Sequence, residues 1–317
     1  MNLQTEIQLH SQKHNQIDYS SKLLLLGSCF SENIGNKFQY YKFQSSLNPF
    51  GILFHPLAIE NLISRSVNKE YYIEEDLYFQ NEQWCCLDAH SKLSSTSKEE
   101  LLARLNRQID NTNNYLSTAT HVIITLGTSW VYRHIASDAI VANCHKLPQK
   151  QFLKELLSVE QVSESFEATI SLVRSVNPKV SFIFTVSPVR HLKDGFIQNT
   201  QSKSHLISAI HNVVEPRKQQ YYFPSYEIMM DELRDYRFYN EDMLHPNNLA
   251  INCIWDKFKN VWISENTELT MQEVDVVQKG LKHKPFNIKS EAHQLFVTKL
   301  QSHIKDLCNK YPHFSFD

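Results

Sequence analysis

The sequence predicts an α/β protein in which helices cover both faces of a short parallel sheet. Short apolar runs that suit buried strands alternate along the chain with longer stretches of helical periodicity, as in parallel sheets. Three of these runs, at residues 23–26, 121–127 and 180–189, lead into the polar blocks GSCF, GTSW and SPVRH. Because ligands bind beyond the carboxyl ends of such strands, we expect these blocks to converge on one site.

The first half of the chain starts with the strand at residues 23–26, which leads into a helix. Phe30, Ile34 and Phe38 recur at helical spacing after it. A turn at residues 48–51 precedes a helix at 56–67, and the alternating aromatic stretch 71–87 predicts a β-hairpin. The sequence SKEE at 97–100 is a capping box that opens a helix running to about Tyr115.

The second half continues the alternation of strand and helix. A helix at residues 158–176 lies between the strands at 121–127 and 180–189, and a helix at 202–214 precedes a fourth strand within 219–228. A further helix begins just after His245, and two helical stretches rich in Lys, Gln and Glu follow from about residue 265. We expect a main domain at residues 1–263 and a helical C-terminal extension at 264–317 that packs on it. A dimer contact is the alternative role for the extension.

Composition narrows the class of protein. The 317 residues are 42% hydrophobic and 21% charged, and the net charge of −2 favours neither nucleic acid nor membrane as a partner. Residues 1–20 lack the pattern of a signal peptide, so we expect a cytoplasmic protein. The six cysteines show no CxxC spacing, so we expect free thiols and neither metal nor cofactor. The sequence does not indicate an oligomeric state.

The turn Gly27-Ser28-Cys29 is the first candidate for chemistry. At a strand-to-helix turn, free backbone N–H groups and the helix dipole are expected to lower a thiol pKa and to stabilise an oxyanion. In the alternative, Ser28 is an N-cap and Cys29 a small buried side chain.

A second candidate is the sequence DMLH, which places Asp242 three residues before His245. The aspartate can hold the imidazole Nδ1–H and leave Nε2 free as a base. An N-capping Asp and an exposed His are the alternative. Other polar residues follow the predicted strands or loops and are expected near the edge of the site, with surface or capping roles as the alternative: His90, His145, Lys146, Arg190, His191, Asn199, Ser202 and Lys203. His145, with Lys146, and Arg190 are the substrate-binding candidates, together with His90.

Six stretches carry a resemblance to a known family. They are GSCFS at residues 27–31, NPFGILFHPL at 48–57, TLGTSWVY at 125–132, VANCHK at 141–146, SPVRH at 187–191 and DMLHPN at 242–247. The chain resembles the GSCFA family, which is grouped with the SGNH/GDSL hydrolases. The resemblance covers roughly residues 5–260 and implies a three-layer α/β/α sandwich.

The resemblance also implies roles for residues. Cys29 stands where SGNH hydrolases carry the nucleophilic serine, with Ser28 as the alternative nucleophile one residue away, and Asp242 and His245 complete the triad. Oxyanion donors would be the backbone N–H groups of Cys29 and Gly51. Gly127 and Ser129 fall at the position of a Gly-x-Asn motif, with Ser129 replacing the Asn. Ser129 or Asn143 would then take the role of that Asn.

Three functions fit these residues. The first is a hydrolase or acyltransferase acting on a small-molecule or saccharide ester, with an acetylated sugar suggested by family analogy. The second is a ligand-binding module on an inactive hydrolase fold. The third is a redox-sensing thiol protein in which Cys144 resolves an oxidised Cys29.

Overall fold

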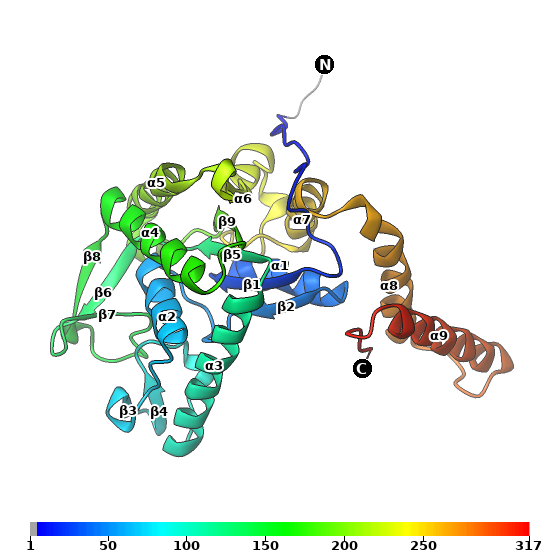
Figure 1. The fold of residues 1–317 in the computed structure, drawn as a ribbon, viewed down its shortest axis with the longest axis horizontal. Helices are drawn as coiled ribbons and strands as arrows, with labels where there is room; N and C mark the ends of the chain where they lie inside the picture. Colours follow the sequence, from blue (N-terminus) through cyan, green and yellow to red (C-terminus); the bar gives the residue numbers. More distant parts are fainter. Residues whose placement is uncertain (1–4, 317) are drawn as a thin grey trace.

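A five-stranded parallel sheet forms the centre of the molecule (Figure 1). The computed structural model of the chain describes residues 5–316. The strands lie in the order β10-β9-β5-β1-β2, so the chain starts near one edge and crosses to the other. Their bounds are Lys22–Gly27 for β1, Gln44–Leu47 for β2, His121–Leu126 for β5, Ser181–Val186 for β9 and Gln220–Tyr222 for β10.

Alternating side chains of the strands pack against two layers of helices. In β1, Leu24 and Leu26 face one core cluster, whereas Leu23 and Leu25 face the other, as the period of two in a strand requires. The helices of the first layer are α2 (Pro56–Asn68), α3 (Lys98–Thr118), α4 (Val159–Val176) and α5 (Phe196–Val213); those of the second include α1 (Cys29–Tyr40) and α7 (Asn248–Trp262). The predicted α/β/α sandwich is therefore confirmed.

Antiparallel strands lie beside the sandwich. The predicted hairpin forms from β3 (Leu77–Gln80) and β4 (Gln83–Cys86). A three-stranded sheet of β6 (Trp130–His134), β7 (Ala139–Val141) and β8 (Phe152–Leu156) was not predicted, because its half-exposed strands lack a clear alternation. Strand β2 was also missed, since its sequence QSSL is polar and suits an edge strand. A short helix α6 (Ser225–Glu227) continues as a π-helix at Ile228–Glu232.

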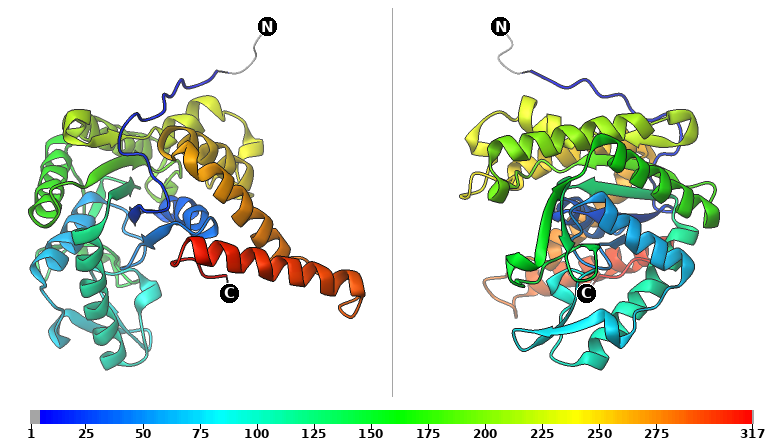
Figure 2. Two further views of the ribbon diagram at one scale, coloured as in Figure 1. Left: turned by 45° about the vertical axis from the view of Figure 1, so that its right-hand side comes forward. Right: turned by 90° about the vertical axis from the view of Figure 1, so that its left-hand side faces the viewer.

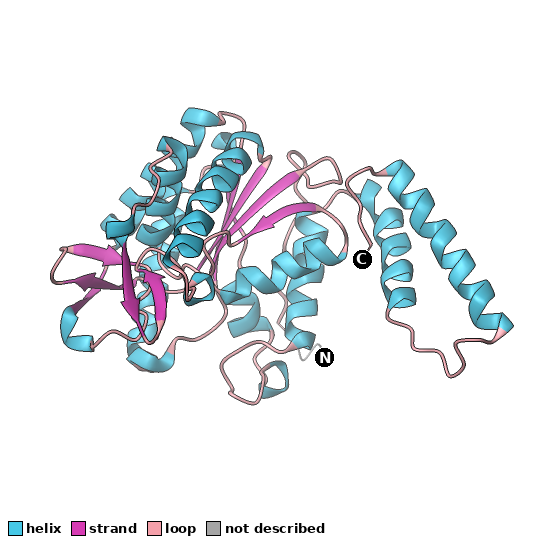
Figure 3. Cartoon of the chain, turned by 90° about the horizontal axis from the view of Figure 1, so that it is seen from below, coloured by secondary structure: helices cyan, strands magenta, loops and turns pink. Residues whose placement is uncertain are grey.

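The C-terminal helices α8 (Glu268–Leu281) and α9 (Glu291–Lys310) form an arm that extends away from the sandwich (Figures 2 and 3). The arm is anchored at its base, where Val274, Leu307 and Phe314 are buried in the same cluster as helix α1. Near its tip Leu295 is 57% exposed, so only part of the apolar stripe packs on the main domain. None of the helices among residues 5–316 is long and apolar enough to cross a membrane.

Candidate functional site

The polar blocks that follow β1, β5 and β9 meet at one edge of the sheet. The backbone N–H of Ser28 donates to Thr125 O at 2.9 Å, and that of Ser187 donates to Leu126 O at 2.8 Å. The first residues after these three strands are thus fixed to one another, as the parallel topology requires. This edge is the frame of the candidate site.

The turn after β1 is built around a glycine. Gly27 has a φ of +130°, and a Cβ atom there would lie 2.0 Å from Thr125 O, so only glycine fits. Ser28 is fully buried and caps α1, accepting a hydrogen bond from Phe30 N at 3.3 Å. Cys29 is the first residue of α1 and is partly exposed. The turn therefore hides the hydroxyl and presents the thiol.

The Cys29 thiol is not activated by its position alone. Burial raises its pKa, the carboxylate of Glu32 raises it further, and the charge of Lys203 lowers it. The expectation that the helix N-terminus gives a low pKa does not hold, because desolvation of the thiolate outweighs the helix dipole. Cys29 thus needs a base to become a nucleophile at neutral pH.

Lys203 is a buried lysine behind the site. Its side chain is 1% exposed, and Nζ donates to Ser187 O at 2.7 Å, at the carboxyl end of β9. Burial lowers its pKa to about 7, and the neighbouring Cys29 opposes that shift. The alternative of a surface or capping role is wrong for Lys203, because this residue continues the buried stripe of α5.

Asp242 and His245 form the expected pair. Asp242 Oδ2 lies 2.6 Å from His245 Nδ1, while Oδ1 accepts the backbone N–H groups of Leu244 and His245. These hydrogen bonds lower the pKa of Asp242 to about 2, and the bond from the backbone N–H of His245 has the largest effect. Both side chains are 46% exposed. The carboxylate therefore fixes the imidazole and leaves its Nε2 open to the site.

No hydrogen bond joins Cys29 Sγ to His245 within residues 5–316. His191 links the two residues electrostatically, because its pKa is lowered by burial and then by the charges of Lys203 and His245. Lys203 in turn acts on Cys29. These four side chains form one electrostatically connected group at the sheet edge, which we call the Cys29 cluster.

The predicted oxyanion donors are mostly engaged within the protein. Gly51 N donates to Asn48 O at 2.7 Å, and Gly127 N donates to Phe54 O at 2.8 Å. Ser129 N donates to Ser202 Oγ at 2.8 Å, and Ser129 Oγ donates to Ser202 O. In contrast to the prediction, these groups are not free donors in this arrangement.

Two other polar atoms at the sheet edge are buried without a hydrogen-bond partner, namely Asn48 Nδ2 and His191 Nε2. Asn48 Oδ1 accepts the N–H of Gly27 at 2.9 Å, so its amide lies against the nucleophile turn. His191 Nε2 would lie 3.0 Å from a Cβ placed on Gly127. Burial lowers the pKa of His191 to about 3, so the ring is neutral. Buried polar groups are rarely left unpaired, so each atom gains a hydrogen bond if neighbouring side chains move and admit a ligand.

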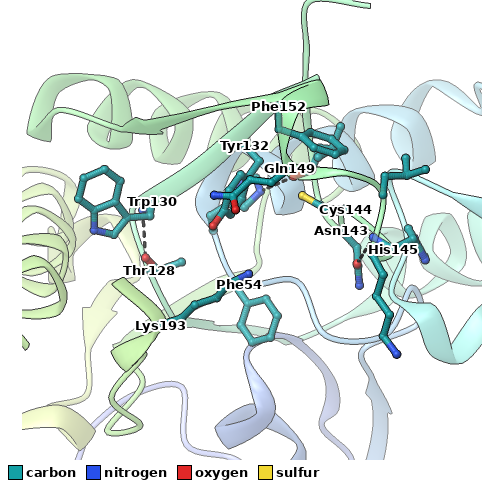
Figure 4. Close-up of a pocket in the computed structure, with 15 residues that line it drawn as sticks. Phe54, Thr128, Trp130, Tyr132, Asn143, Cys144, His145, Gln149, Phe152 and Lys193 are labelled. Carbon is teal, nitrogen blue, oxygen red and sulfur yellow. Dashed lines mark hydrogen bonds between the residues drawn. The ribbon is translucent and has the colours of Figure 1, made fainter. Parts of the chain in front are cut away.

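A pocket of about 400 Å³ adjoins this cluster (Figure 4). The predicted residues Asn143 and His145 line it, on the loop that follows β7. His145 Nε2 lies 2.7 Å from Cys86 O and 2.9 Å from Ala89 O, so this nitrogen is held in the protein. Asn143 Oδ1 accepts the His145 N–H, which leaves the amide nitrogen for a ligand.

Two further candidates, His90 and Arg190, do not line this pocket. His90 packs over Gly51, and its Nδ1 accepts the Lys92 N–H as a helix cap. Arg190 points to Met230 Sδ at 3.0 Å, on the side of the loop that carries His245. All six cysteines are free, and Cys85 and Cys86 are buried. Residues 5–316 contain no cluster of His, Cys, Asp or Glu side chains that would hold a metal ion.

Comparison with protein families accounts for most of the chain. The model of the GSCFA family matches residues 22–258. The chain belongs to the GSCFA family. The model of the GSCFA domain protein C-terminal domain matches residues 274–317, and the predicted boundary at 263–264 falls between the two matches. A comparison with curated proteins finds no match.

Proposed function

We propose that this GSCFA protein is a thiol-dependent hydrolase or acyltransferase of the SGNH type that acts on a carbon–oxygen ester. The observation that carries the proposal is the contrast at the turn after β1, where Ser28 is fully buried and Cys29 is partly exposed. This contrast favours the thiol over the hydroxyl as nucleophile. We assign the base to the Asp242–His245 pair, whose Nδ1 is held by the carboxylate.

The reaction then follows from the charges of the site. His245 Nε2 takes the proton of Cys29, and Sγ attacks the acyl carbon. The ester C–O bond breaks, and His245 returns the proton to the leaving alcohol. Water or an acceptor hydroxyl next attacks the thioester, again giving its proton to His245, and frees the thiol. Contacts of this kind often tighten only when substrate binds, which fits the absence of a Cys29–His245 hydrogen bond within the described chain.

Three groups are suited to hold the oxyanion. They are the backbone N–H of Cys29 and the unpartnered side-chain nitrogens of Asn48 and His191. The neutral His191 donates in the tautomer that carries its proton on Nε2. The ammonium of Lys203 favours the thiolate, because its charge lowers the pKa of Cys29. Loss of one oxyanion donor typically costs about 2.7–4 kcal/mol of transition-state stabilisation.

The test is hydrolysis of an activated acetyl ester by the purified chain and by Cys29→Ala, Ser28→Ala and His245→Ala. We expect Cys29→Ala and His245→Ala to lose activity and Ser28→Ala to keep most of it. Cys308→Ala is the matched control, since Cys308 is a partly exposed thiol on the distant helix α9. Loss of activity in Ser28→Ala alone would contradict the assignment of the nucleophile.

A ligand-binding module on the same fold is the second candidate. The engagement of the Gly51 and Gly127 N–H groups favours it, because it weakens the expected oxyanion hole. In that case the chain binds a ligand at the Cys29 cluster, and none of the variants above differs from the wild type in turnover.

A further inference from the structure

The pocket beside the Cys29 cluster has aromatic walls. Phe54, Tyr132 and Phe152 line it, and the loop of residues 141–147 closes one side (Figure 4). We call this cavity the β6 pocket, since Trp130 and Tyr132 of strand β6 contribute to it. Aromatic rings offer flat apolar faces, and about 400 Å³ is the size of a small-ligand site. Its shape therefore suits a compact ring.

The charge of the β6 pocket has one sign. Of the described residues that line it, four carry basic groups and none carries a carboxylate; the four are His55, His145, Lys146 and Lys193. Burial lowers the pKa of both histidines, so the positive charge resides on the two lysines. Lys193 Nζ lies 5.9 Å from the centre of the Tyr132 ring, and its charge lowers the pKa of Cys144 against the larger effect of burial. In Figure 4 the Lys193 side chain extends toward Phe54, inside the cavity.

Burial raises the pKa of Tyr132 and the carboxylate of Asp194 raises it further, so one acidic side chain acts on the pocket wall, but it is already paired. Asp194 follows Lys193 directly and bonds to the ammonium of Lys154, outside the lining of the pocket. Neither Lys146 nor Lys193 has an ion-pair partner within residues 5–316. Two unpaired ammonium groups beside low-dielectric walls attract an anion.

The loop of the pocket is also held under strain. His145 has a φ of 45° and Lys146 a φ of 62°, which side-chain-bearing residues rarely adopt in succession. The hydrogen bonds from His145 to Asn143, Cys86 and Ala89 maintain this geometry. Backbone strain of this kind tends to collect where side chains must be held for a ligand.

The β6 pocket shares a wall with the Cys29 cluster. Phe54 O accepts the N–H groups of Gly127 and Thr128, and the Phe54 ring lies 5.3 Å from the His191 ring. Thr128 Oγ1 lies 2.9 Å from Ser202 Oγ, next to Lys203 in the chain. The β6 pocket therefore borders His191, one member of the Cys29 cluster.

We propose that the β6 pocket binds an anionic sugar-sized ring, the part of the ester substrate that carries a carboxylate or a phosphate. This proposal rests on the proposed ester chemistry for the identity of the substrate, whereas the binding itself does not depend on it. The aromatic side chains pack against the ring, and the ammonium groups of Lys193 and Lys146 bind the anionic group. Asn143 contributes its free amide nitrogen.

Calorimetric titration of the full wild-type chain tests this with glucose, glucuronate and glucose 6-phosphate. These probes contain no ester, so turnover plays no part. We expect at least one of the two anionic sugars to bind about tenfold or more tightly than glucose, the worth of one charged hydrogen bond. The tighter of the two identifies the anion as carboxylate or phosphate. Equal affinities for all three sugars, or no binding of any, would overturn the proposal.

Variants locate the anion. Lys193→Gln and Lys146→Gln are expected to weaken binding of the preferred anionic sugar by about tenfold each. Lys150→Gln is the matched control, because Lys150 is exposed on the next segment but does not line the pocket. An equal effect of Lys193→Gln and Lys150→Gln would refute the assignment. All three side chains are exposed, so the variants are expected to fold.

The two proposals can fail separately. If the anionic sugars bind while no acetyl ester is hydrolysed, the ester chemistry fails and the pocket stands. If acetyl esters of neutral and anionic sugars are hydrolysed with the same KM, the pocket assignment fails and the ester chemistry stands.

Discussion

Replacing Gly27 by alanine tests how tightly the nucleophile turn is built. Gly27 has a φ of +130°, and an added Cβ would lie 2.0 Å from the backbone oxygen Thr125 O. The φ alone costs a side-chain-bearing residue about 1–3 kcal/mol. Relief of the clash requires β1 or β5 to shift, which costs about 1–3 kcal/mol more. We therefore expect Gly27→Ala to lower the free energy of unfolding by about 2–6 kcal/mol.

Gly195→Ala is the matched control. Gly195 also has a positive φ, +101°, but its added Cβ would meet Gln198 Oε1, the end of a flexible side chain. The Gly195→Ala variant should lose only the part of the free energy of unfolding that the positive φ costs, because it has no clash with the backbone. Urea unfolding followed by tryptophan fluorescence gives both values. Equal losses in the two variants would refute the role assigned to the close approach of β1 and β5.

Three further outcomes follow from the charges and donors of the site. Burial lowers the pKa of Lys203 to about 7 from 10.5, so between these pH values the unfolded chain binds more protons than the folded chain. The free energy of unfolding should therefore rise as the pH is raised through this range. A pH series of unfolding should show this rise in the wild type and not in Lys203→Met. Asp242→Asn should lower kcat for an acetyl ester by up to about a hundredfold, because His245 loses its fixed tautomer; an unchanged kcat would exclude the pair from the reaction. His191→Phe keeps a ring beside Phe54 and removes the donor, so kcat should fall by about 10²–10³-fold. His191→Gln restores a donor and should recover part of that loss. Equal kcat values for the wild type and His191→Phe would rule out an oxyanion role.

The sandwich could be predicted because its strands and helices follow simple periodicities. The apolar runs of β1, β5 and β9 are buried on both faces, so their sequences are almost continuously apolar, with single threonines in β5 and β9. The hairpin of β3 and β4 was also predicted from its alternation. The sheet of β6, β7 and β8, by contrast, consists of short strands that mix buried and exposed positions without a regular alternation.

The site was predicted in outline and missed in its buried polar groups. Gly27, Cys29, Asp242 and His245 lie in motifs whose spacing has a chemical meaning. Lys203 was expected at the edge of the site, with a surface or capping role as the alternative; its full burial was not predicted, and lysine is seldom fully buried. The spacing of residues in α5 could have indicated this burial, because three polar residues lie on the same helix face as the apolar stripe. The buried residues of this face are Asn199, Ser202, Lys203, Leu206, Ala209, Ile210 and Val213. Asn48 and His191 became donor candidates only because their side-chain nitrogens lack a hydrogen-bond partner in the structure. No sequence pattern indicates such a missing partner.

The most direct test of the account is to locate the acyl group on the enzyme. The chain is mixed with an activated acetyl ester, quenched in acid, digested and analysed by mass spectrometry with and without hydroxylamine, which cleaves a thioester. We predict an acetyl group on the peptide that contains Cys29, removed by hydroxylamine and absent from Cys29→Ala. Two results would contradict the account. The first is an adduct that resists hydroxylamine and disappears in Ser28→Ala. The second is a Cys29→Ala variant that hydrolyses the ester at an undiminished rate.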